Sequence, residues 1–232
     1  ELDPVHEFSV AWVDCVARGA AAGRGVYMAG DFAPAGKLEP LKEGGLSVPF
    51  APPFSLVNRW SLRLFNEAYW RRHPARRQRA RVGFQPFFYP LDGVLHWNRI
   101  YGRQGFQQYQ CVIPWAAADT ALPELLAVIA ASGQGSFLAV LKRFGDLPAP
   151  GWLSFPCPGV TLALDFPNHR DRNAGLFGRL DAVVRAAGGR LYPAKDAHMT
   201  PDDFRRSYPR WEDLERLRDP LLLSRFWQRV TA

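Results

Sequence analysis

The chain has 232 residues, of which 47% are hydrophobic and 22% are charged. These values are typical of a soluble globular protein with one large or two small domains, and they exclude a disordered chain. The formal net charge of +7 admits a nucleic acid, an acidic membrane surface or a phosphorylated substrate as partner, without choosing among them. Cys15, Cys111 and Cys157 are odd in number and lack CxxC spacing, which indicates free thiols in a reducing compartment.

Hydrophobic periodicity divides the chain into short strands and helices. Strands alternate apolar and polar side chains, helices repeat them every three to four residues, and breaks rich in glycine and proline separate the segments. In chain order we predict strands at 8–15 and 23–28, an irregular connection at 32–54, a helix at 56–70, a strand or ordered loop at 84–89, a turn at 90–93, a strand at 106–113, a helix at 116–132, strands at 137–144 and 159–166, and a helix at 173–187.

This order of elements predicts an α+β fold, in which helices cover an antiparallel sheet. Gly188 and Gly189 end the last of these helices, and a short extended run follows. Thr200 then marks the start of another helix as its N-cap, with Pro201 in the first helical position and Asp203 where a capping-box acid belongs. The longest uncharged stretch, 125–141, is interrupted by Ser132–Ser136 and is too broken for a membrane span of about 20 apolar residues.

The segment 71–81 contains six arginines and almost nothing apolar, which is typical of an exposed loop. It could contact a phosphate or an anionic surface, or it could be a solvated basic loop. No helix-turn-helix, zinc finger or RNA-binding signature accompanies it, so we do not expect a nucleic-acid partner.

The sequence has no GxSxG, HExxH, P-loop or GxGxxG motif, and its five histidines lack the spacing of metal ligands. Two polar features remain. Gln108 and Gln110 share one face of an otherwise apolar strand, which is either a surface face or a polar surface beneath a substrate. Tyr192 and Lys195 lie three residues apart on a tight connection, which is either a solvated turn or part of a site.

Four stretches of the chain carry a resemblance to a known family. Flavin-dependent sugar oxidases of the vanillyl-alcohol-oxidase-like superfamily, and more distantly sugar-lactone oxidases of the arabinonolactone type, contain similar segments in the same order. The stretches are FSVAWVDC with GRGV, HWNRIYGRQGFQQYQCVIP, SFLAVLKRFG with TLALDFP, and LYPAKD followed by MTPDDFRRSYPRW.

The resemblance implies FAD as cofactor and oxidation of a hydroxyl on a sugar or a polyprenyl-phosphate sugar. Lys195 corresponds to a lysine that contacts both substrate and flavin, and Tyr192 to a catalytic tyrosine of the same motif. Ala163 stands where the family has a cysteine and Thr161 where it has an asparagine, so we expect the reactivity of that thiol to be absent. The implied substrate-binding residues are Gln108, Gln110, Lys142, Phe144, Thr161 and Ala163.

The resemblance also implies a division of the chain. Residues 1–189 would form a substrate-binding (cap) domain, and 190–232 would be a C-terminal segment that belongs with an FAD-binding domain. The glycine-rich half that holds the flavin pyrophosphate has no counterpart in this chain, and a start without methionine suggests a piece of a longer gene product. We therefore expect the apolar residues at 221–223 and 226–227 to pack on that other domain.

The expected partners are the sugar substrate, a membrane surface contacted peripherally, and an epimerase or reductase that acts with the oxidase. The expected location is cytoplasmic, at the inner face of the membrane. The alternative function is a non-catalytic α+β binding module that engages an anionic surface through its arginine-rich loop. The two interpretations differ in whether the polar residues singled out above meet in one place.

Overall fold

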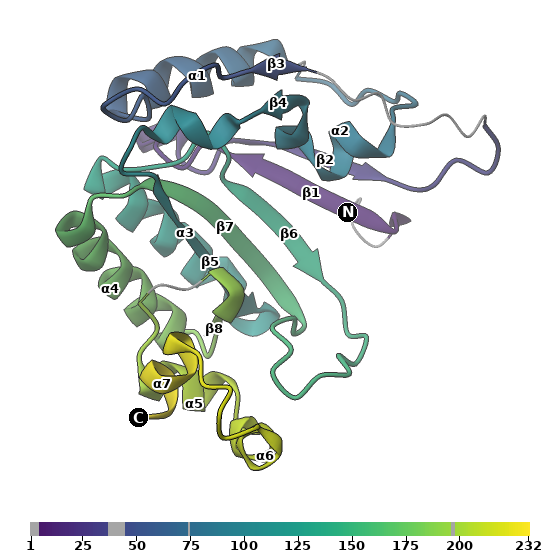
Figure 1. The fold of residues 1–232 in the computed structure, drawn as a ribbon. Coiled ribbons are helices and arrows are strands. Elements are labelled where there is room, and N and C mark those ends of the chain that lie inside the picture. The colour runs from purple at the N-terminus through teal and green to yellow at the C-terminus, as the bar shows by residue number, and fades with distance from the viewer. Residues whose placement is uncertain (1–4, 37–44, 74, 196–197) are drawn as a thin grey trace.

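The computed structural model describes residues 5–36, 45–73, 75–195 and 198–232, and Figure 1 shows their arrangement. A curved six-stranded sheet crosses the molecule, and its neighbouring strands are antiparallel throughout. The strand order is β2-β1-β6-β7-β5-β8. The strands are β1 (Phe8–Val13), β2 (Gly25–Gly30), β5 (Phe106–Pro114), β6 (Val140–Phe144), β7 (Gly159–Pro167) and β8 (Arg190–Leu191).

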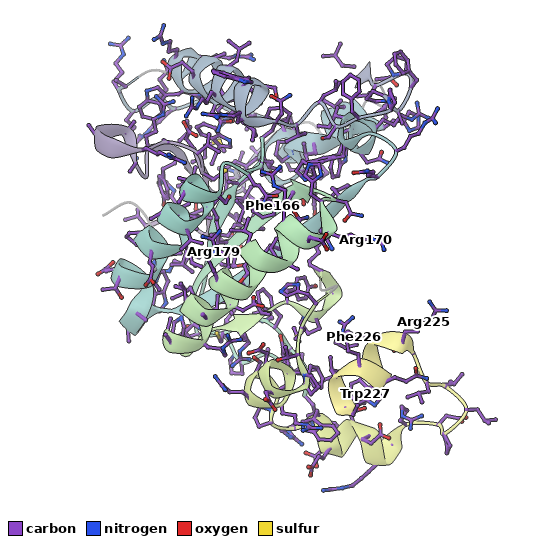
Figure 2. The ribbon with its side chains drawn as sticks, turned by 90° about the vertical axis from the view of Figure 1, so that its left-hand side faces the viewer. Phe166, Arg170, Arg179, Arg225, Phe226 and Trp227 are labelled. Atoms are coloured by element: carbon purple, nitrogen blue, oxygen red, sulfur yellow. The ribbon has the colours of Figure 1, made fainter. Side chains whose placement is uncertain are left out.

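Two long helices, α3 (Trp115–Ser132) and α4 (Arg170–Ala186), cover one face of this sheet. We call this the back face. Its alternate side chains, such as Tyr109 and Leu162, are buried against those helices in the main core. Three short helices follow near the C-terminus, α5 (Pro201–Ser207), α6 (Trp211–Leu217) and α7 (Arg225–Thr231), and Figure 2 shows α7 beyond the end of α4. Helices on one side of an antiparallel sheet confirm the predicted α+β class.

A second layer lies over one end of the opposite, front face (Figure 1). It has its own small core, in which Val57, Leu62 and Tyr101 are buried. Its members are β3 (Leu46–Ser47), α1 (Arg59–Arg72), α2 (Phe84–Phe88) and β4 (Val94–Leu95), with 3₁₀ turns at Pro90–Gly93 and Trp97–Tyr101. β3 and β4 pair in parallel, a contact that the sequence did not predict.

The prediction of a strand or ordered loop at 84–89 is wrong, because helix α2 occupies Phe84–Phe88. Its aromatic side chains favour a strand locally. Instead Phe88 packs edge-to-face on Phe8 of β1, at a ring distance of 5.0 Å, and Phe87 lies against Gly30 of β2. Pro86 is tolerated because it falls in the first turn, where its missing N–H is not needed. Tertiary packing therefore overrides the local preference.

Helix α3 is long and apolar enough to cross a membrane by length and composition. In this fold it packs on β5, β7 and α4. Leu125 and Ile129 are fully buried there. The inner side of this helix therefore belongs to the main core.

Candidate functional site

The front face brings together the polar residues that the sequence singled out on three adjacent strands. Paired residues of antiparallel strands point to the same side of a sheet. Gln110 pairs with Ala163, and Lys142 pairs with Thr161. Gln108 pairs with Asp165. Phe144 follows on the same side of β6. All six predicted substrate-binding residues therefore lie on one face, away from the main core.

Both glutamines are half-buried and hydrogen-bonded to β7. The Gln108 amide donates to Asp165 Oδ1 at 2.8 Å, and the Gln110 amide donates to Thr161 Oγ1 at 3.1 Å. These bonds offset the cost of placing two amides on a partly desolvated strand. They also fix the amide orientation, so that each glutamine presents its carbonyl oxygen as an acceptor. Of the two alternatives, the geometry favours a polar surface that can receive a ligand.

Asp165 is a site residue that the sequence interpretation did not select. It is only 6% exposed and lies on the front face of β7. Burial raises the pKa of its carboxyl group above the ordinary 3.8, while the bond from Gln108 and the charge of Lys195 act in the opposite direction. The alternation of β7 places Asp165 on the same face as Ala163 and Thr161. That signal could have identified it, because a charged side chain on a buried strand face needs partners.

Tyr192 and Lys195 reach this face from the connection after β8. The Tyr192 N–H donates to the Gln110 carbonyl at 2.9 Å, and its ring stacks on Phe155 at 4.5 Å. The Lys195 N–H donates to the Tyr192 carbonyl at 3.1 Å, which closes a 3₁₀ turn. Lys195 also lies close enough to Asp165 to lower the pKa of that carboxyl.

The aromatic ring of Phe155 connects this turn to the end of β6. It meets Phe144 edge-to-face at 5.8 Å and Tyr192 face-to-face. The polar surface therefore has an apolar border beside Lys142, which is itself exposed. An acid, two lysines, two amides and a hydroxyl beside aromatic rings suit a polyhydroxylated ligand with an anionic or apolar extension.

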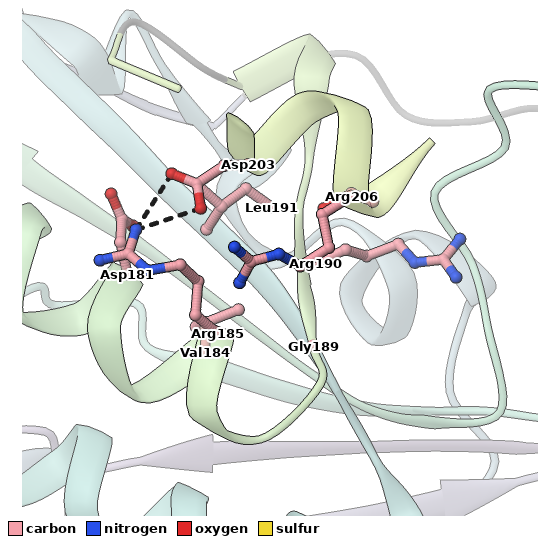
Figure 3. Close-up of a pocket in the computed structure, with 9 residues that line it drawn as sticks. Asp181, Val184, Arg185, Gly189, Arg190, Leu191, Asp203 and Arg206 are labelled. Atoms are coloured by element: carbon pink, nitrogen blue, oxygen red, sulfur yellow. Dashed lines mark hydrogen bonds and ion pairs between the residues drawn. The ribbon is translucent and has the colours of Figure 1, made fainter. Parts of the chain in front are cut away.

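The segment after this turn is held to the back of the sheet. The Tyr208 hydroxyl donates to the Leu191 carbonyl at 2.6 Å. Arg185 of α4 bonds both carboxylate oxygens of Asp203 at 3.1 Å, as Figure 3 shows. The hollow beside this pair is about 10 Å³, which is room for about one water, so it is no substrate site.

The apolar residues near the C-terminus divide into two groups. Trp227 is buried and Phe226 half-buried, and both rings pack edge-to-face on Phe204 of α5. The expectation that they need another domain to pack on is therefore wrong. Leu221, Leu222 and Leu223 are exposed, and the expectation that they pack on another domain stays a prediction.

Within the residues that the structure describes, no three His, Cys, Asp or Glu side chains gather as metal ligands would. Cys15 and Cys111 are buried, and burial raises the pKa of each thiol to about 12. Both are therefore inert core thiols.

Among the curated proteins that this chain resembles, the following two match it over nearly its whole length. The first, from Mycolicibacterium smegmatis strain ATCC 700084 / mc(2)155, is 35% identical over 226 residues, 92% of this chain. Its name is decaprenylphosphoryl-beta-D-ribose oxidase. This chain is similar in sequence to that oxidase. The predicted resemblance is thereby confirmed for decaprenylphosphoryl-beta-D-ribose oxidase, although no family model matches the chain.

The second match is a Streptomyces coelicolor protein named for its position in the mprA 5' region, 33% identical over 236 residues and covering 94% of this chain. The chain spans 47% of the decaprenylphosphoryl-beta-D-ribose oxidase and 62% of the Streptomyces protein. The activity of those whole proteins is therefore only proposed for this chain.

Proposed function

We propose that this chain forms the substrate-binding half of an FAD-dependent oxidoreductase that oxidises a hydroxyl group of a sugar or a prenyl-phosphate sugar. One observation carries the proposal. The residues implied by the family resemblance, which are scattered between positions 108 and 195, meet on one face of the sheet. The similarity to an oxidase over 92% of the chain supports the same interpretation.

The side chains of this face fit a flavin ring with a sugar beside it. When bound, the flavin supplies the hydride acceptor. Lys195 would hold the flavin, since its ammonium group can stabilise negative charge on the cofactor. The face also offers Asp165 and the glutamine carbonyls as acceptors, which sugar hydroxyls require.

The proposed reaction converts an alcohol carbon into a carbonyl. The residues of the front face would hold the sugar, a bound flavin would supply the acceptor for the hydride, and a group on the protein would take the hydroxyl proton. The proposed proton acceptor is the carboxylate of Asp165, which borders the site and whose pKa is raised by burial. Tyr192 would position the sugar against this carboxylate, because its ring is fixed on Phe155.

The proposed substrate preference follows from Thr161 and Ala163. Thr161 is buried and already accepts a hydrogen bond from Gln110, so it presents a smaller polar group than an asparagine would. Ala163 leaves space at the centre of the face, which favours a substrate with a bulkier group there. The alternative, a non-catalytic module, does not account for the meeting of these polar residues.

The test uses the gene product that contains this chain, purified and reconstituted with FAD. We expect visible flavin bands that bleach without oxygen when the correct sugar or prenyl-phosphate sugar is added. Lys195→Met should retain the bands and lose bleaching by at least about a hundredfold in rate, because a positioned charge contributes strongly to such steps.

The matched control is Arg143→Met, because Arg143 points to the back face and lies over the ring of Trp115 at 5.3 Å. It should bleach at the normal rate. A colourless protein after reconstitution, or a Lys195→Met protein with unchanged turnover, would refute the proposal.

A further inference from the structure

The positive charge of this chain is concentrated in one segment. Residues 59–81 contain eight arginines and one acid, Glu67, which gives this segment a formal charge of +7. The other 21 cationic residues of the chain are matched by the other 21 acidic residues. The segment therefore carries the whole net charge of +7. It comprises α1 and the exposed connection to α2, and in Figure 1 both lie along the top of the molecule, opposite α5–α7.

Helix α1 presents apolar side chains outward as well as inward. Leu62 and Asn66 face the protein and are fully buried. On the outer side Trp60 is 69% exposed and Leu64, one turn later, is 75% exposed. A globular helix normally turns such residues inward. An outward Trp–Leu pair beside basic residues is typical of helices that lie in a membrane interface.

The arginines of α1 are placed around these apolar side chains. The guanidinium groups of Arg59 and Arg63 lie over the Trp60 ring, at 5.1 and 5.9 Å from its centre. Arginine stems can cover apolar surface while their charged ends reach outward. The Trp60 ring and two cations therefore form one amphipathic unit on the surface.

A groove of about 600 Å³ runs beside this unit, between α1 and the connection from β1 to β2. Trp60 and Leu64 border it, together with three arginines. Two of these, Arg18 and Arg24, are fixed by the Ala130 carbonyl and by Asp14 with Glu67. Arg63 is the third, and it leans on Trp60. Asp14 and Glu67 also line the groove and are ion-paired with Arg24, so Arg18 and Arg63 supply its remaining positive charge. Positive charge next to exposed apolar groups matches the two parts of an anionic lipid, its headgroup and the start of its chains.

We propose that α1 and the arginine-rich connection after it dock this protein on an anionic phospholipid bilayer. Attraction between the arginines and the lipid headgroups holds the segment at the surface. Trp60 and Leu64 enter the headgroup boundary, with the α1 axis parallel to the membrane plane. The proposal is independent of the proposed catalytic function, and its test needs no activity.

Other occupants fit less well. A second copy of the chain would bring two +7 segments together, which electrostatic repulsion opposes. A nucleic acid would use the arginines but gains nothing from Leu64. A bilayer interface uses both the charge and the apolar side chains of this surface.

The experiment measures binding of the full chain to vesicles by co-sedimentation. One vesicle type is pure phosphatidylcholine, and the other contains phosphatidylcholine and phosphatidylglycerol in equal parts. We expect binding to the second type only, and weakening as salt is raised. Replacing Arg76, Arg77, Arg79 and Arg81 by glutamine should reduce the affinity by about a hundredfold or more, since each arginine near an anionic surface contributes to binding. These four residues lie outside helices and strands, so the fold should survive.

The matched control removes the same charge elsewhere, by glutamine at Arg170, Arg172, Arg179 and Arg225. These residues are exposed on α4 and α7, and Figure 2 shows three of them away from α1. The control should bind almost normally. Equal losses in the two four-site variants would overturn the proposal, because only net charge would then matter.

A second pair of variants tests the apolar contact. Trp60→Ser with Leu64→Ser should weaken binding about tenfold or more, whereas Leu221→Ser with Leu222→Ser, at the other end of the molecule, should not. Full affinity in the Trp60/Leu64 variant would refute insertion. Tighter binding to duplex DNA than to the anionic vesicles at the same salt would refute the choice of a bilayer.

Discussion

Burial makes the charged form of the Asp165 carboxyl group on the front face unfavourable. Burial is the largest influence on its carboxyl group and raises its pKa, so the folded chain keeps this proton at a pH where the unfolded chain has released it. The free energy of unfolding therefore falls as pH rises from the ordinary pKa of 3.8 through the raised pKa of the folded chain. Above the raised pKa this loss of stability stays constant. Such a cost is expected where a binding site needs a buried acid.

Asp165→Asn should therefore stabilise the fold at pH 7. The amide keeps the shape of the carboxyl group and can still bond Gln108, so the change removes mainly the buried charge. We expect the free energy of unfolding to rise by about 1 kcal/mol, with a Tm about 2–4 °C higher for a chain of this size. The gain should vanish near pH 3, where the carboxyl group is protonated in both states. Thermal unfolding followed by circular dichroism across this range checks it.

Asp146→Asn is the matched control, because Asp146 is exposed in the loop after β6. It should leave Tm unchanged at both pH values. A lower Tm for Asp165→Asn at pH 7 would mean that the attraction of Lys195 outweighs burial, and the predicted stabilisation would then be wrong in sign.

Elements whose signals are local were predicted well from the sequence. The N-cap of α5 is an example, since Thr200 accepts a bond from the Asp203 N–H at 3.2 Å and Pro201 occupies the first turn. Even in this helix the carboxylate of Asp203 accepts a hydrogen bond from Arg185 of α4. Only the tertiary fold brings these two side chains together. The prediction for the α2 stretch failed for the same reason, because its conformation depends on the Phe8 ring of β1 and on Gly30 of β2.

Thr200→Ala should lower the free energy of unfolding by about 1 kcal/mol, because it removes the cap oxygen and the hydroxyl bond to Asp203 at 2.7 Å. Thr200→Ser keeps that oxygen and should recover most of the loss. Thr120→Ala, at an exposed threonine of α3, is the control. Urea unfolding of the wild-type chain and these variants checks the order, and equal midpoints for Thr200→Ala and Thr120→Ala would show that the cap contributes nothing.

At the scale of the whole molecule, one buried network joins the sheet, a covering helix and the C-terminal segment. The Tyr109 hydroxyl on β5 donates to Asp181 Oδ1 of α4 at 2.9 Å, and His198 Nε2 lies 3.1 Å from Asp181 Oδ2. Tyr109 and His198 also stack, at 5.8 Å between ring centres. The alternation of β5 placed Tyr109 on the core face, but neither partner could be predicted, since they lie far away in sequence.

Tyr109→Phe should destabilise the fold by about 1–2 kcal/mol, because Asp181 loses one partner in a buried setting. Tyr89→Phe, at an exposed tyrosine, is the control and should change Tm little. Thermal unfolding of both variants measures the difference. An unchanged Tm in Tyr109→Phe would show that water replaces the hydroxyl at no cost.

The strand order has a consequence for how the chain is made. β1 forms a local hairpin with β2, but its other edge pairs with β6, where Val10 meets Lys142. While a ribosome synthesises the intervening segment, that edge stays open, and an unpaired edge can join other chains. Pairings between strands so distant in sequence also slow folding. Aggregation during synthesis should therefore be governed by how soon β6 arrives, and slower translation between β2 and β6 would lengthen the vulnerable interval.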